Sequence, residues 1–210
     1  AGVAVFQEAK KLGKTSIIKA EGYLWISQGL AVILGGLAAY ALSHELGLGP
    51  VIAASLVGLL ASIIWPDTSV AAYCGAFVGM TSDILLFNYW EVTLAGLISG
   101  GVFLLTKDVF NGFGGKLGTI ALVGTAITGL SLNREFLILP VADWESNALV
   151  LATALVATPL TFYFNIARKH GPVLASAIVG MTGGLILPAV MPQFGPTLAV
   201  VAICASFAGM

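Results

Sequence analysis

Long apolar segments alternate with short polar connections along most of this chain. A helix needs about 20 predominantly apolar residues to cross the hydrocarbon core of a bilayer. By this criterion the pattern predicts about eight membrane spans, several of them near the short limit: 21–43, 49–66, 69–87, 90–106, 116–132, 148–167, 171–188 and 195–210. Because most connections are short, consecutive spans should pack as antiparallel neighbours. The predicted fold class is all-α, a polytopic transmembrane helix bundle.

The first 20 residues depart from this pattern. Four lysines, at positions 10, 11, 14 and 19, are interspersed with apolar residues. The segment is too polar to span a membrane and lacks the long apolar core of a secretory signal. Residues 1–20 are therefore predicted to form an amphipathic helix on the cytoplasmic membrane surface.

One apolar segment occurs twice. Residues 49–66 and 171–188 align without gaps and are identical at 8 of 18 positions, including an initial Gly-Pro-Val. Their last residues, Pro66 and Pro188, are expected to end the two helices. A second stretch, 72–80, matches 202–210 at five of nine positions, and the offset changes from 122 to 130 residues. A longer loop at 189–195 would explain this change.

Five predicted spans lie from the start of the first copy to the start of the second, so the copies should cross the membrane in opposite directions. This arrangement is typical of an inverted-topology repeat. The predicted parts are a first five-helix unit (21–132), an extracytoplasmic loop (133–147) and an incomplete second unit (148–210), and we expect the natural chain to continue through roughly two more helices.

A rival alignment pairs 76–82 with 177–183 and would make the repeat parallel. We prefer the inverted alignment because two consecutive helices match together.

Composition and charge agree with a membrane protein. The chain is 58% hydrophobic and 9% charged, whereas soluble domains carry roughly 25% charged residues. A net charge of −1 argues against nucleic acid as a partner. With the N-terminus in the cytoplasm, eight of the nine basic residues lie on the inner side and only Arg134 lies outside, as the positive-inside rule expects. The chain is predicted to be a multi-pass protein of the cell (inner) membrane.

Two Gly-Met-Thr stretches are the best candidates for a solute or ion pathway. Flexible backbone beside a hydroxyl could break a helix and line a site, or the glycines could serve close helix packing and the threonines could bond back to their own helices. Two carboxylates nearby add a candidate for proton or cation binding, because burying a charge in a membrane is costly. The candidate pathway residues are Gly79, Met80, Thr81, Ser82, Asp83, Glu91, Gly180, Met181 and Thr182.

Catalytic chemistry is not indicated. No hydrolase, kinase or redox motif is present, and Cys74 and Cys204 are expected to be buried thiols within apolar runs. We therefore expect no enzyme activity, no metal and no cofactor.

The sequence favours a transporter or channel for a small solute or ion, with its site near mid-membrane between the two units. The alternative is a non-catalytic membrane subunit or scaffold of a larger complex. Expected partners are the lipid bilayer, a small solute or ion, and further copies or partner membrane subunits. A transporter should bring polar residues of both units to one cavity, whereas a scaffold should present an apolar groove.

Overall fold

The computed structural model describes residues 2–109, 114–136 and 144–210, with side chains from Tyr23 onward except Glu145. Within these ranges the chain is all-helical and contains no β-strand, so the predicted fold class is confirmed at this level. The α-helices are α1 (Gly2–His44), α2 (Pro50–Ile64), α3 (Ser69–Val78), α4 (Tyr89–Leu105), α5 (Lys116–Ser131), α6 (Trp144–Phe162), α7 (Pro172–Val190) and α8 (Gly195–Ser206). Short helical turns are η1 (Pro66–Thr68), η2 (Tyr163–Ala167, a π-helix) and η3 (Phe207–Gly209).

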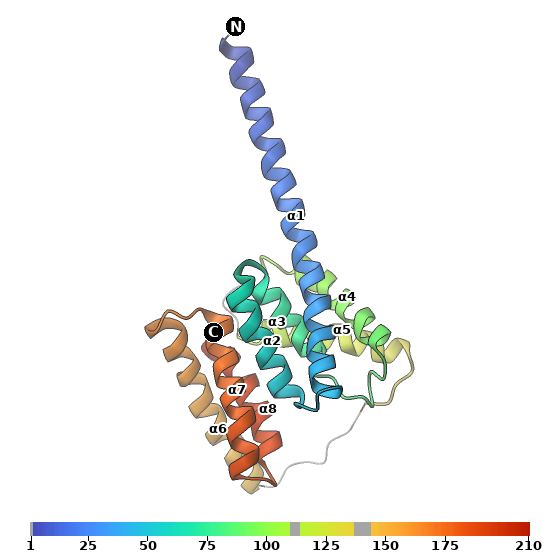
Figure 1. Cartoon of the computed structure of the whole chain (residues 1–210), viewed down its shortest axis with the longest axis vertical. Helices are drawn as coiled ribbons and strands as arrows, with labels where there is room; N and C mark the ends of the chain where they lie inside the picture. Colours follow the sequence, from blue (N-terminus) through green and yellow to red (C-terminus); the bar gives the residue numbers. More distant parts are fainter. Residues whose placement is uncertain (1, 110–113, 137–143) are drawn as a thin grey trace.

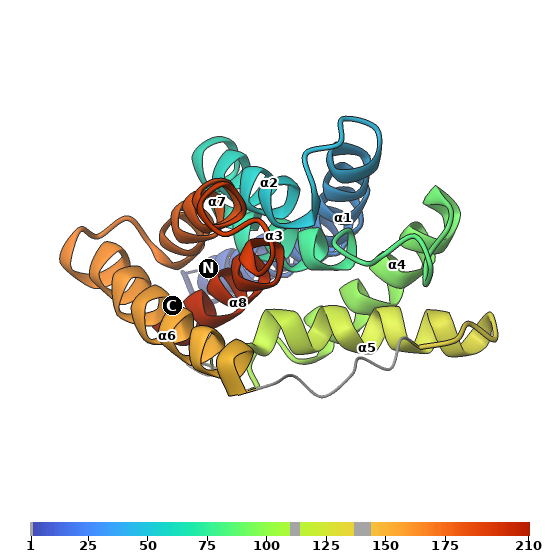
Figure 2. The same ribbon diagram turned by 90° about the horizontal axis from the view of Figure 1, so that it is seen from below.

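Figure 1 shows α1 as a long helix whose N-terminal half extends away from the other helices. The predicted surface helix (1–20) and the first predicted span (21–43) are parts of this one continuous helix. The helices α6, α7 and α8 form one side of the bundle, while α4 and α5 lie at the other side, as the view from below in Figure 2 also shows. Between them, α2 packs against α7 and α3 packs against α1.

Three helices are long and apolar enough to cross a membrane: Tyr23–His44, Ser146–Ala167 and Pro172–Val190. Four further apolar helices are shorter: Pro50–Ile64, Tyr89–Leu105, Lys116–Ser131 and Gly195–Gly209. These lengths and compositions indicate a membrane protein.

The helix α3 is much shorter than the predicted span 69–87, because it ends at Val78. After it, the Thr81 hydroxyl donates a hydrogen bond to the Val78 carbonyl at 2.7 Å, and the Thr81 N–H donates to the same oxygen at 3.2 Å. These bonds satisfy a carbonyl that a continued helix would have used, so the chain turns away. At ten residues, α3 is about 15 Å long, about half the thickness of a bilayer core.

The repeated helices begin and end alike. Gly49 (φ 78°, ψ 158°) and Gly171 (φ 82°, ψ 159°) precede α2 and α7 in the same positive-φ conformation, which favours glycine, and proline occupies the first helical position of both. The residues that end them, Trp65 (φ −134°, ψ 69°) and Met191 (φ −130°, ψ 75°), also match. Each is followed by a proline.

The prediction that Pro188 ends its helix is therefore wrong. Pro188 lies inside α7, and Pro192 is the structural counterpart of Pro66. The predicted longer loop is also wrong, because α2–α3 and α7–α8 are joined by connections of equal length, 65–68 and 191–194. The additional residues are helical: α7 extends beyond the counterpart of Ile64, and α8 begins before the counterpart of Ser69.

Two groups of three helices make equivalent contacts, and we call them the first unit (α1–α3) and the second unit (α6–α8). Gly79 and Gly209 are counterparts in the aligned sequences. A Cβ atom placed on Gly79 would contact α1 at Gly36 O, Ala39 Cβ and Tyr40 N. A Cβ atom placed on Gly209 would contact α6 at Thr158 O, Thr161 Cβ and Phe162 N. Each of these α6 residues lies 122 positions after its α1 counterpart. The structural similarity of the two units thus includes α1 and α6, although the sequence comparison did not align these two helices.

The two units meet through equivalent elements. Gly180 of α7 packs against Ser55 of α2, and Gly184 packs against Val51 and Ile52, so the two helices run antiparallel. The rings of Phe77 and Phe207, also counterparts, meet at 4.8 Å between centroids and 75° between planes. The first unit therefore contacts the second through α2 and α3, and the second contacts the first through the equivalent segments, α7 and η3.

Close backbone approach between α1 and α3 makes Gly75 a test of the packing. A Cβ atom at Gly75 would overlap the Val32 backbone, so Gly75→Ala should lower the free energy of unfolding by about 1–3 kcal/mol, the usual range for overpacking. Gly101→Ala is the control, because a Cβ atom there meets nothing within 4 Å and alanine favours a helix by up to about 1 kcal/mol. Equal thermal unfolding midpoints for both variants in detergent would contradict this packing.

Candidate functional site

The predicted pathway residues of the first unit lie at the end of α3. Gly79 is buried against α1, Met80 is half-buried on the hydrophobic core, and Thr81 is bonded to Val78. Ser82 and Asp83 are exposed in the turn that follows. The helix does end here, but in the described part of the chain Thr81, Ser82 and Asp83 line none of the three pockets discussed below, and Thr182 lines only a groove on the outside of α7.

The second stretch lies within a continuous helix, so of the two alternatives for Gly180–Thr182 the structure agrees with helix packing and not with a broken helix. The Thr182 hydroxyl donates to the carbonyls of Ile178 and Val179, at 2.9 and 3.0 Å. Gly180 is buried against Ser55, and Met181 is half-buried. The three residues serve α7 itself and its packing.

The Glu91 side chain is buried (1% exposed), and its carboxylate accepts two hydrogen bonds. One carboxylate oxygen accepts a hydrogen bond from the Arg134 guanidinium at 2.7 Å, and the other accepts one from the Phe87 N–H at 2.7 Å. The guanidinium carbon lies 3.9 Å from the centroid of the Phe87 ring. Glu91 therefore joins the start of α4 to the segment after α5.

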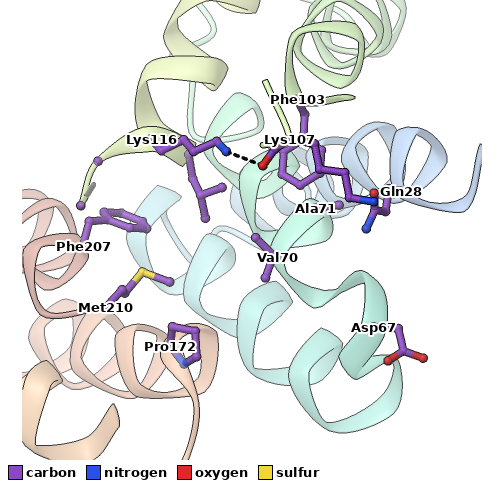
Figure 3. A pocket seen from close by; sticks show the side chains of 13 residues that line it. Gln28, Asp67, Val70, Ala71, Phe103, Lys107, Lys116, Pro172, Phe207 and Met210 are labelled. Carbon is purple, nitrogen blue, oxygen red and sulfur yellow. Dashed lines mark hydrogen bonds between the residues drawn. The ribbon is translucent and has the colours of Figure 1, made fainter. Parts of the chain in front are cut away.

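A pocket of about 380 Å³ lies where the two units meet, and we call it the inter-unit pocket. Figure 3 shows it from close by, with side chains of both units around it. The first unit contributes Gln28, Asp67, Val70 and Ala71, the second contributes Pro172, Phe207 and Met210, and the end of α4 and the start of α5 contribute Phe103, Lys107, Gly114, Gly115, Lys116 and Leu117. The geometry brings charged groups to the boundary between the units.

Two lysines line this pocket: Lys116 is hydrogen-bonded to backbone carbonyls, whereas Lys107 lies near an aromatic ring. Lys116 Nζ donates to the carbonyls of Thr106 (2.7 Å) and Lys107 (3.1 Å), and so fastens the start of α5 to the end of α4. Lys107 Nζ lies 5.9 Å from the centroid of the Trp25 ring, within the range of a cation–π contact. Asp67 is the one acidic side chain among the described lining residues, so the lining carries a net positive charge.

Gln28 adds an unpaired acceptor. Its Oε1 atom is buried and has no hydrogen-bond partner among the described residues. Buried polar atoms without a partner are rare and often indicate a bound water or ligand. Gln28 lies one helical turn after Trp25, on the same side of α1, so the acceptor and the Lys107 ammonium share one region of the pocket.

Sequence reasoning did not select these residues. Lys107 and Lys116 served only as indicators of membrane orientation, and Asp67 lies in a connection between predicted spans. The sequence feature that could have indicated this pocket is Gln28, a polar side chain within the apolar segment 21–43.

Two apolar grooves lie on the outside of the units. The groove between α1 and α2 has a volume of about 900 Å³, and the groove between α6 and α7 about 370 Å³. Every residue lining the second has its counterpart lining the first, for example Leu34 and Val156, or Val57 and Val179. The equivalence of the units therefore extends to their surfaces.

The buried polar contacts between units do not share this equivalence. The Tyr73 and Ser176 hydroxyls are hydrogen-bonded at 3.1 Å, and Ser176 also bonds to Ser206. All three are buried, and their counterparts are apolar: Ile203, Ala54 and Ala76. These three hydroxyls thus have no polar equivalents at the matching positions of the other unit.

The two cysteines differ. Cys74 is buried as predicted, with its Sγ atom 3.5 Å from the Leu117 carbonyl oxygen of α5. Cys204, its counterpart, is exposed, so the prediction of a buried thiol is wrong there. Among the described residues no group of three His, Cys, Asp or Glu side chains is placed to hold a metal ion.

No protein-family model matches this chain, and neither a curated protein nor a solved structure resembles it significantly. The geometry of the chain itself must therefore support any functional assignment.

The Glu91–Arg134 pair provides a test of whether Glu91 is structural. Glu91→Gln should lower the free energy of unfolding by about 1–3 kcal/mol, below the usual cost of breaking a fully buried pair because Arg134 is partly exposed. The double variant Glu91→Gln/Arg134→Gln should recover part of that loss, since neither charge is then left alone. Thermal unfolding in detergent measures both. A fully stable Glu91→Gln protein would contradict the structural role.

Proposed function

We propose that the protein is a multi-pass transporter or channel of the cell membrane, and that a small anionic solute enters it through the inter-unit pocket. The observation that carries this proposal is the pocket itself, since residues of both units line it and its lining carries a net positive charge. Solute sites of many transporters lie at the interface between two repeated units.

The proposal includes an inverted-topology repeat with a cytoplasmic N-terminus. The antiparallel packing of α2 against α7, and the equivalent glycine contacts of Gly79 and Gly209, support it. The distribution of lysines and arginines supports the orientation, which puts Lys107 and Lys116 at the cytoplasmic end of the pocket. Solute would then enter from the cytoplasmic side.

The lining also narrows the class of solute. Ammonium groups on Lys107 and Lys116 attract an anion, and a pocket with low-dielectric walls strengthens this attraction. The unpaired Gln28 Oε1 accepts a hydrogen bond, so a solute with a hydroxyl or amino donor satisfies it. We propose a small organic anion that carries such a donor.

A second candidate is a non-catalytic membrane subunit or scaffold. The two equivalent apolar grooves favour it, because an apolar groove on a membrane protein can seat a helix of another chain. A scaffold requires no movement of solute, so a flux measurement separates the two candidates.

Uptake by liposomes containing the purified protein tests the transport proposal with two matched dianions. Malate carries a hydroxyl that succinate lacks, and choline serves as the cation. We expect uptake of malate above succinate and no uptake of choline. Lys107→Ala should lower malate uptake at least tenfold through loss of the charge that attracts it, roughly 1.4 kcal/mol or more. Gln28→Leu should remove the preference for malate over succinate.

The control is Arg168→Ala, a basic residue that lies outside the pocket and should leave uptake unchanged. If choline enters as fast as malate, or if Lys107→Ala transports malate normally, the proposed pocket chemistry is wrong. If no solute enters, the scaffold is the better assignment.

A further inference from the structure

Three aromatic rings lie at the inner end of the inter-unit pocket. Phe207 lines the pocket (Figure 3) and is buried. Its ring meets that of Phe77 at 4.8 Å between centroids and that of Tyr73 at 5.8 Å, and the Tyr73 and Phe77 rings meet at 4.8 Å. Each ring thus contacts the other two. We call this group the aromatic barrier (Tyr73, Phe77 and Phe207).

The aromatic barrier is attached to both units. Tyr73 and Phe77 belong to α3, one helical turn apart, whereas Phe207 begins η3 directly after α8. The Tyr73 ring packs against Gly58 of α2, where a Cβ atom would lie 2.5 Å from the Tyr73 Cδ2 atom. The Tyr73 hydroxyl is hydrogen-bonded to Ser176 of α7 at 3.1 Å. The barrier therefore joins α2, α3, α7 and η3 across the boundary between the units.

The barrier extends deeper into the molecule than the pocket does. Val70 and Ala71, at the start of α3, line the pocket, and Phe77 lies six residues after Ala71, about 9 Å farther along the helix. Phe77 packs against the hydrophobic cluster that contains Tyr40 and Leu86 as well as against the one near the pocket. Leu86 precedes the start of α4, while the pocket lies at the other end of that helix. Phe77 therefore lies between the pocket and the opposite end of the bundle.

The equivalence of the units relates the two sides of the barrier. Phe77 is the counterpart of Phe207, and Pro50 is the counterpart of Pro172, which also lines the pocket. An equivalent pocket on the other side of the membrane would thus be lined by Pro50 and Phe77. In the described part of the chain, neither residue lines any of the three pockets described above. The inter-unit pocket thus reaches the Phe207 side of the barrier and not the Phe77 side.

We propose that the aromatic barrier is the gate of the transporter, and that it closes the inter-unit pocket from the extracytoplasmic side until the rings of Phe77 and Phe207 separate. An apolar constriction stops ions and polar solutes because they would lose their hydration there. The Tyr73–Ser176 hydrogen bond holds α3 against α7 and so keeps the barrier closed. This inference rests on the proposed function and adds the path that a solute takes beyond the pocket.

Access to one pocket position tests the gate without any solute. Val70 lines the pocket and is 40% exposed, and Val70→Cys is made in a background in which Cys74 and Cys204 are replaced by alanine. Sulfonatoethyl methanethiosulfonate, a small membrane-impermeant anion, is applied to intact cells or to inverted vesicles. A fluorescent maleimide then measures the unreacted thiols after denaturation. With the barrier intact, we expect the reaction only in inverted vesicles.

Phe77→Ala should open the barrier, so that Val70→Cys reacts at least tenfold faster in intact cells. Phe103→Ala is the matched control, because it removes another buried ring that lines the pocket but lies outside the barrier, and it should change this rate less than twofold. Phe77→Leu removes less packing, and it should act in the same direction where Phe77→Ala does not insert into the membrane. An unchanged rate in inverted vesicles shows that each variant keeps the pocket.

Either of two results would overturn the gate. Val70→Cys could react equally from both sides while the barrier is intact, or the Phe77 and Phe103 variants could react alike. Neither result depends on uptake of malate, because the labelling needs no solute. A protein that gives the expected labelling but takes up no solute would contradict the proposed solute and not the barrier.

Discussion

The antiparallel contact of α2 with α7 holds the two units together, and the inter-unit pocket depends on it. Lipid supplies no hydrophobic force between helices, so close packing and hydrogen bonds must join them. Gly180 lets α7 approach so closely that a Cβ atom there would lie 2.5 Å from Ser55 Oγ. The Tyr73–Ser176 hydrogen bond adds a buried polar link across the same interface. Together these contacts fix where Pro172 and Phe207 lie relative to Gln28 and Ala71 in the pocket.

The sequence predicted much of the helical structure because local signals determine it. Gly49 and Gly171 adopt the same positive-φ conformation before a proline, and the Gly-Pro sequence identified the starts of α2 and α7. The equivalence of α1 with α6 was not detectable in this way. No residue of 23–48 is identical to its counterpart in 145–170. Their shared contacts use backbone atoms such as Gly36 O and Thr158 O, which any residue can supply.

The candidate site was much less predictable than the helices. Lys107 and Lys116 carried a signal for orientation, but which cavity they face depends on how α4 and α5 pack. Glu91 was selected for its charge, and its partner Arg134 lies 43 residues away in a segment that the apolar pattern does not describe. The end of α3 was missed for a different reason: the apolar pattern continues beyond Val78, while the hydrogen bonds of Thr81 turn the chain. The pocket and the Glu91–Arg134 pair join groups that lie far apart in the sequence, whereas α3 ends through hydrogen bonds between residues only three positions apart.

The central claim is that the two units cross the membrane in opposite directions around the inter-unit pocket. Leu48 and His170 test it most directly, because they are counterparts at an offset of 122 residues and both are exposed in the connections before α2 and α7. Each is replaced by cysteine in a Cys204→Ala background and labelled with a membrane-impermeant maleimide in intact cells and in inverted vesicles. We predict that Leu48→Cys is labelled only in intact cells and His170→Cys only in inverted vesicles. Labelling of both from the same side would contradict the inverted arrangement.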